Sequence, residues 1–409
     1  MVEPRVTRRL PVIRTLKKKE EPKPQTVPTV LPRIPTRIRG PPLIIGRLSS
    51  AQRLRRDKTF HSASTPVGKA LVELEHEFLT VDDAQVGEVL DRVNSFIYTI
   101  AHRINKNRHN LKFGELYFSG PALNNLGTKL NFSHLNLYFP LKFKEFRLRD
   151  THEGYTKIYL NRNPSYDRFQ SIRSNSHKNL ISPIKISAAI HEMMTHICQS
   201  VGRGTVLPFD DNPSSYGEGG YQVVVLLDDY IRLTVIPTLH IKLQKREVDE
   251  TIIVAKPYLF DKDPESDTLW RYDNPSKAKR LLTTMNHADR GTRSRALCLL
   301  HICCMLDPVL QLCPHEFVSM VMFSTFDEDV DQLPSWQMED LEKCFMKILT
   351  CWHQYMISGV LEHPFIAGLN CFAKMEEKDR LLIRNRIARL IGNRRELVRL
   401  LQLRTASTQ

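Results

Sequence analysis

The sequence predicts an α+β fold of two lobes, in which a lobe built on a mixed β-sheet is followed by an all-helical lobe. Short apolar runs of the strand type dominate from about Gly114 to Pro257, with one helical run between them. After Trp270 the apolar period becomes helical almost throughout. The 409 residues are 41% hydrophobic, which is enough for two sizeable cores. We therefore predict lobes at 61–270 and 271–409.

Residues 1–60 differ in composition from the rest of the chain. They hold nine of the 24 prolines, and 16 Lys and Arg against 4 Asp and Glu. Such a segment cannot bury enough apolar surface to offset the chain entropy that folding removes. We predict a disordered basic arm, whose charge favours contact with an anionic membrane surface.

The positive charge of the chain is concentrated at its two ends. Residues 1–60 carry a surplus of 12 and residues 376–409 a surplus of 5, so that 61–375 carries −3 of the total of +14. A nucleic-acid partner requires a dense basic face, because most of the affinity comes from phosphate contacts. We therefore do not expect nucleic acid to bind the folded body.

The cysteines and the hydropathy indicate the compartment. The eight cysteines occur mostly inside apolar helical runs, without the spacing of a disulfide framework. This usage is typical of reduced thiols in a protein that faces the cytosol. The sequence predicts no transmembrane helix, since no stretch approaches 18 consecutive apolar residues.

The first lobe is expected to begin with two helices. Thr65 and Pro66 have the chemistry of an N-cap and a first-turn proline, and the helical period that follows breaks near Thr80 and resumes over 84–104. Strand-type runs then follow at 114–120, 135–141, 156–160, 221–227, 231–241 and 251–255, with a helix predicted over 182–201.

The second lobe is expected to contain helices only. Helical periods are found at 276–285, 293–306, 314–326, 338–360 and 378–401. The last of these runs is amphipathic and basic, and we interpret it as a packed terminal helix with one solvated face. A cleft is expected between the two lobes.

One segment has the layout of a nucleotidyltransferase active site. In such enzymes a Gly-Ser turn holds triphosphate, an acidic pair on the next strand holds Mg²⁺, and a later strand adds a third carboxylate. Here the turn is Ser119-Gly120, the paired positions are His134 and Asn136, and the third is Thr234. None of the three is the charged oxygen ligand that Mg²⁺ prefers. The sequence therefore predicts a degenerate, non-catalytic site without a metal.

Longer stretches resemble the Mab (male-abnormal) nucleotidyltransferase-like superfamily, whose members are relatives of cyclic GMP-AMP synthase. The matching stretches are "LYFSGPALNNL", "SHLNLYFPL", "TIIVAKP", "LWRYDNPSKAKRLLTTMNHADRGTRSRALCLL" and "LEHPFIAGLNCF". They occur in the family's order and cover roughly residues 65–390. Within the superfamily the chain is most similar to the mitochondrial dynamics proteins, which recruit the fission dynamin at the mitochondrial outer membrane.

The resemblance implies a two-lobed nucleotidyltransferase-like fold that acts as an adaptor and carries ADP or GDP in its cleft in some members. Ser119, Gly120, His134 and Arg293 match the nucleotide-contacting positions. The chain departs from the pattern at Pro121 and Arg290, where nucleotide-binding members carry serines.

The resemblance also implies a partner and a location. The family's dynamin-contacting loop corresponds to the segment around Arg162 and Tyr166, and it is about five residues shorter here than expected. The implied location is the cytosolic face of the mitochondrial outer membrane, although the N-terminal transmembrane helix of such receptors is missing from the sequence. A homodimer is also left open.

The sequence contains candidate zinc ligands, but their spacing does not favour a zinc site. His301, Cys303, Cys304, Cys313 and His315 have suitable ligand chemistry. Adjacent positions on a helix point about 100° apart, however, and the first three lie in one continuous helical pattern. In "HEMMTH", similarly, the histidines at 191 and 196 are five residues apart, where a zincin helix needs four.

Two alternatives to the adaptor hypothesis remain. The first is a residual nucleotidyltransferase that uses Asp228 and Asp229, which a predicted hairpin turn keeps away from the cleft. The second is a developmental or signalling protein of the wider superfamily without a mitochondrial role.

Overall fold

The computed structural model describes residues 65–106, 111–121, 126–143, 146–150, 155–160, 171–209 without 176 and 178, 223–241, 253–257, 267–273, 275–327, and 341–403 without 367 and 374. All of them belong to one compact unit, Leu43–Gln409. The predicted arm and the predicted contact residues Arg162 and Tyr166 lie outside the described residues.

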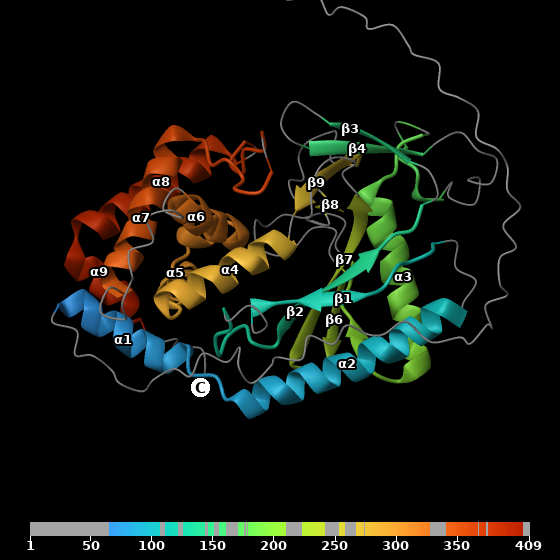
Figure 1. Cartoon of the computed structure of the whole chain (residues 1–409), viewed down its shortest axis with the longest axis horizontal. Helices are drawn as coiled ribbons and strands as arrows, with labels where there is room; N and C mark the ends of the chain where they lie inside the picture. The colour runs from blue at the N-terminus through green and yellow to red at the C-terminus, as the bar shows by residue number, and fades with distance from the viewer. Residues whose placement is uncertain are drawn as a thin grey trace, which may run out of the picture. The chain divides into compact units, whose positions relative to one another are not determined.

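The described chain has an α+β fold with a mixed sheet, as the sequence predicts (Figure 1). The strands are β1 (Tyr117–Ser119), β2 (His134–Pro140), β3 (Phe146–Asp150), β4 (Tyr155–Leu160), β5 (Thr205–Val206), β6 (Val223–Leu227), β7 (Ile231–Ile241), β8 (Ile253–Pro257) and β9 (Leu269–Asp273). Their order is β1-β2-β7-β8-β9-β4-β3, and β6 pairs with both β5 and β7.

The long strand β7 connects the parts of the sheet. It pairs in parallel with β2 on one side, and antiparallel with β6 and then β8. Every other pairing between described strands is antiparallel. The sheet is therefore mixed because of the single parallel pair, β2 with β7.

Helices α2 (Asp83–Lys106) and α3 (Pro183–Val201) share one apolar core with the sheet. Alternate residues of β2, namely Leu135, Leu137 and Phe139, are buried in it. They face Phe96 of α2 and Met194 of α3 within the same cluster. The other face of β2 is consequently left for its polar residues.

The remaining helices form a second core. They are α1 (Pro66–Phe78), α4 (Pro275–Asp289), α5 (Thr292–Leu306), α6 (His315–Asp327), α7 (Leu341–Ser358), α8 (Glu377–Gly392) and α9 (Arg394–Leu401). The Thr65 side chain accepts a hydrogen bond from the Gly68 N–H at 2.9 Å, which confirms the predicted cap of α1. Although α1 precedes the sheet and was predicted within the first lobe, it packs in this helical core beside α5, α7 and α9.

Two details of the sequence prediction are corrected. Strands β3, β5 and β9 were missed, so the chain is not helical directly after Trp270. The predicted terminal helix over 378–401 is two helices, because Asn393 leaves the helical conformation with φ −119° and ψ 90°. The Asn393 side chain then accepts from the Glu396 N–H at 3.2 Å and caps α9.

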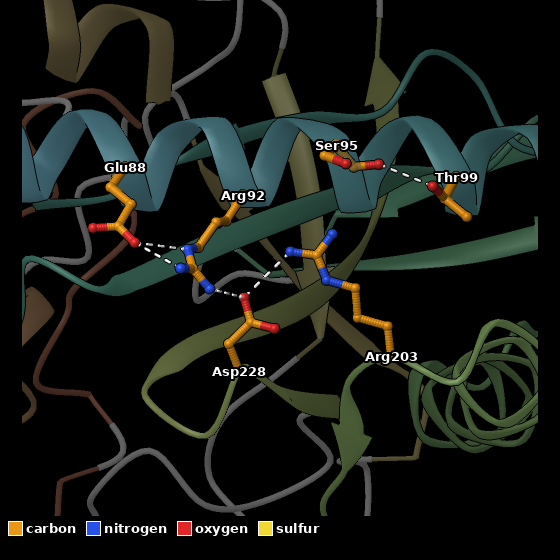
Figure 2. A network of polar contacts seen from close by, with 6 residues as sticks. All are labelled: Glu88, Arg92, Ser95, Thr99, Arg203 and Asp228. Carbon is orange, nitrogen blue, oxygen red and sulfur yellow. Dashed lines mark hydrogen bonds and ion pairs between the residues drawn. The ribbon is translucent and has the colours of Figure 1, made fainter.

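Two arginines, one from α2 and one from the segment after α3, hold the turn between β6 and β7 through ion pairs with one carboxylate (Figure 2). Asp228 accepts from Arg92 of α2 at 2.8 Å and from Arg203, which follows α3, at 3.2 Å. Asp228 and Asp229 both have left-handed backbones, with φ of 54° and 64°. This confirms the predicted hairpin turn at these two residues. The hydrogen bonds from Arg92 and then from Arg203 hold the pKa of the Asp228 carboxyl below the ordinary 3.8.

We expect Asp228→Asn to destabilise the chain at neutral pH, because both arginines lose their charged acceptor. A depressed pKa contributes stability that is present above the unfolded pKa and is lost as the pH falls through the folded pKa. In urea melts, the difference from wild type should thus persist down to about pH 5 and shrink below pH 3.8.

Asp229→Asn is the matched control. It removes the same charge from the neighbouring left-handed residue, which has no ion pair within the described part of the chain. If the two variants followed the same pH curve, the ion pairs of Asp228 would have no role in stability.

Candidate functional site

The sheet register aligns three of the predicted positions in one row. Ser119 of β1 lies opposite Asn136 of β2, and Asn136 lies opposite Thr234 of β7. Paired residues of neighbouring strands point to the same face of a sheet. The structure therefore brings Ser119, Asn136 and Thr234 together on the face opposite the α2 and α3 core. All three are partly exposed.

A second row lies next to the first and is cationic. His134 at the start of β2 pairs with Arg232 of β7, and both are partly exposed. The Arg232 N–H also donates to the Ser133 carbonyl at 3.1 Å, which fixes the register at this end of the pair. A guanidinium beside the first of the paired positions repels a divalent cation and favours an anion. Sequence reasoning missed Arg232, whose only signal is its place two residues before Thr234.

The two neighbouring rows together contain five residues, and we call this set the polar row: Ser119, His134, Asn136, Arg232 and Thr234. They offer hydroxyl, amide, imidazole and guanidinium groups, and no carboxylate. Such groups can donate hydrogen bonds to phosphate or carbonyl oxygens, but they do not supply the charged oxygen ligands that a Mg²⁺ pair requires.

Two tyrosines at one end of the polar row were also missed. The Tyr117 and Tyr138 rings stack with centroids 4.7 Å apart and planes inclined by 8°. The Ser119 hydroxyl lies within hydrogen-bonding distance, 3.3 Å, of the Tyr138 hydroxyl. The serine predicted to hold phosphate therefore has a protein partner in this conformation. The alternation of strand residues could have identified the pair, since both tyrosines are two residues from members of the polar row.

Gly120 is required by the close approach of the β1 turn to β2. A Cβ atom at this position would lie 2.7 Å from Leu135 Cδ2 and 2.8 Å from the His134 carbonyl oxygen. Pro121 follows, and its carbonyl accepts from the Leu126 N–H at 2.8 Å. Gly120 therefore allows the end of β1 to pack closely on β2, while Pro121 has no N–H to offer to a bound phosphate.

Arg293, the predicted phosphate contact, is buried at the joint between α4 and α5. Its side chain is 1% exposed, and its Nε donates to Asp289 Oδ2 at 2.6 Å. The same carboxylate accepts from the backbone N–H groups of Gly291 and Arg293, across a turn in which Arg290 and Gly291 have positive φ. In this conformation Arg293 orders the joint and is covered from solvent.

The residues weighed for zinc lie in an apolar setting. Burial raises the pKa of the Cys303 thiol to about 12, and it also raises the pKa values of the Cys304 and Cys313 thiols well above their ordinary range, which keeps all three protonated. Burial, and then the neighbouring His315, lower the pKa of His301 to about 3. Within the described ranges, no three His, Cys, Asp or Glu side chains gather as a metal-ligand set. His191 lies at the core edge with its Nε2 2.9 Å from the Leu207 carbonyl, and His196 is exposed.

Compared with known protein families and with curated protein sequences, the chain matches none of them. Among its described helices, none is both long and apolar enough to cross a bilayer.

We expect Gly120→Ala to destabilise the protein by about 1–3 kcal/mol, because the added methyl group meets backbone and forces β1 away from β2. Equilibrium unfolding in urea would measure the loss.

Gly87→Ala is the matched control. Nothing lies within 4 Å of a Cβ at Gly87, which is inside α2, so alanine should stabilise by about 0.5–1 kcal/mol. A Gly120→Ala protein as stable as wild type would show that β1 can withdraw from β2 without cost.

Proposed function

We propose that this chain is a non-catalytic adaptor with a two-lobed nucleotidyltransferase-like fold, which recruits a dynamin-type GTPase in mitochondrial fission. The observation that carries the proposal is the register of the polar row. Asn136 and Thr234 are direct partners on the parallel pair, and His134 is two residues away on the same face. These are the places where a two-metal enzyme of this fold needs carboxylates.

The chemistry of the polar row supports an adaptor in preference to an enzyme. Phosphoryl transfer by two metals depends on charged oxygen ligands that neutralise the cations. Here an imidazole, an amide and a hydroxyl stand at those places, with Arg232 beside them. Asp228 and Asp229, the acids of the enzyme alternative, lie in the β6–β7 turn, where Asp228 is held by Arg92 and Arg203.

A regulatory ADP or GDP is part of the proposal. His134 and Arg232 offer cationic and donor groups to a diphosphate, while Ser119 is already within reach of Tyr138. Arg293 would join such a site only if its ion pair with Asp289 opened. The proposed place of action is the cytosolic face of the mitochondrial outer membrane.

Restoring the carboxylates should create a metal site. We expect His134→Asp/Asn136→Asp/Thr234→Asp to bind Mn²⁺ measurably by electron paramagnetic resonance, because the register gathers the three side chains on one face. Wild type should bind none above background.

The control is Ser95→Asp/Ser200→Asp/Thr284→Asp, which adds one carboxylate at an exposed position of each of the helices α2, α3 and α4. Equal Mn²⁺ binding by the two triple variants would contradict the proposed homology of the polar row with an enzyme site.

The adaptor role is tested by retention of the host's dynamin-related fission GTPase on the immobilised full chain. We expect specific retention, and a loss of about ten-fold or more for Arg162→Ala/Tyr166→Ala, because Arg and Tyr side chains dominate binding energy at interfaces. Arg103→Ala/Tyr98→Ala, from exposed positions of α2, is the control. If wild type did not retain the GTPase, the proposed mitochondrial role would be wrong. The Mn²⁺ experiment would still test the proposed nucleotidyltransferase-like site.

A further inference from the structure

Large apolar side chains are exposed mainly on one part of the described chain. Among the described residues, seven large hydrophobic side chains are exposed, and five of them are found from the end of α7 onward. Leu381 and Leu382 of α8 are 41% and 50% exposed, and Leu403 after α9 is 50% exposed. The other two are Ile357, in the last turn of α7, and Val360, two residues after that helix.

These apolar residues come from adjoining elements. Arg380 of α8 donates to the Met356 carbonyl at 3.0 Å, so that the end of α7 lies against the start of α8. Ile357 is the next residue of α7, and Leu381 and Leu382 are the next residues of α8. The exposed apolar side chains of the two helices are therefore near one another.

Arginines accompany these leucines on the outer sides of α8 and α9. Arg389, Arg395 and Arg399 are exposed, while the inner sides of the helices place Ile383, Ile387, Leu397 and Leu400 in the helical core. We call the residues Leu381, Leu382, Arg389, Arg395, Arg399 and Leu403 the Leu–Arg face. Because the inner isoleucines of α8 and the inner leucines of α9 anchor the two helices, the arginines of this face are directed to solvent.

Four acids of this region already form ion pairs. Arg386 bridges Asp307 and Glu396, Arg380 pairs with Glu377, and Lys378 pairs with Glu376. The guanidinium groups of Arg389, Arg395 and Arg399, by contrast, have no ion pair or hydrogen bond within the described part of the chain. The Leu–Arg face therefore has a net positive charge that the fold does not neutralise.

We infer that the Leu–Arg face docks on an anionic phospholipid surface. Arginines bind lipid phosphates in bidentate geometry, and leucines that project beside them can enter the boundary between headgroups and acyl chains. An acidic protein helix would favour apolar residues that line a groove, whereas these leucines project with about half of their surface exposed. The inference is independent of the proposed adaptor function, because it uses none of the polar row.

The direct test places a fluorescent reporter on the Leu–Arg face of the full chain. Leu382→Trp is mixed with vesicles of brominated phosphatidylcholine and phosphatidylserine in a two-to-one ratio, after subtraction of the wild-type signal. We expect quenching, because bromine on the acyl chains quenches only tryptophans that reach them, and none with vesicles that lack phosphatidylserine. Tyr98→Trp, at a 65% exposed position of α2, should remain unquenched.

The charge requirement is tested by co-sedimentation of the full chain with the same vesicles, unbrominated. Each basic residue near an anionic membrane contributes about five-fold in binding, so Arg389→Gln/Arg395→Gln/Arg399→Gln should lower the partition coefficient on the order of 100-fold. Lys69→Gln/Arg103→Gln/Lys142→Gln removes the same charge from exposed positions elsewhere and should change it little. Since both triple variants keep residues 1–60, the contribution of that segment cancels. An unquenched Leu382→Trp protein, or equal sedimentation of the two triple variants, would overturn the inference.

Discussion

The parallel pairing of β2 with β7 is the constraint on which the candidate site depends. Parallel strands need a long crossover, and here the chain forms β3, β4, α3, β5 and β6 before β7 returns beside β2. The register of this one pair places Asn136 next to Thr234 and His134 next to Arg232. A shift by one residue would exchange the buried leucines of β2 for its polar residues, so the core with α2 and α3 enforces the register.

Ion pairs connect the sheet to the helical core and fix the turn between two of the helices. Arg271 of β9 forms a bidentate pair with Glu316 of α6, at 2.6 and 2.9 Å. The buried pair of Asp289 and Arg293 fixes the joint that leads from α4 into α5. A guanidinium so covered must be matched by a nearby carboxylate, because an unpaired buried charge is costly. The motif that resembles a phosphate contact thus has a structural role in this conformation.

Two groups of arginines are found in the described chain: some form ion pairs with carboxylates, and others are exposed to solvent. Arg92, Arg203, Arg271, Arg293 and Arg386 each have a carboxylate partner. The exposed arginines of α8 and α9 have none among the described residues. Net charge alone does not distinguish the two groups, since a paired arginine and a solvated arginine count equally in it.

The sequence by itself determined the α+β class, the cap at Thr65, the limits of α1 and α2, and the missing carboxylates of the polar row, because these follow from local periodicity and residue chemistry. It missed β3, β5 and β9, whose short and partly polar segments become strands only through their partners. Only the tertiary structure decided that α1 packs with the helical core, that Arg232 stands beside His134 and that Arg293 is buried. Each of these depends on contacts between residues far apart in the chain, which a local pattern does not contain.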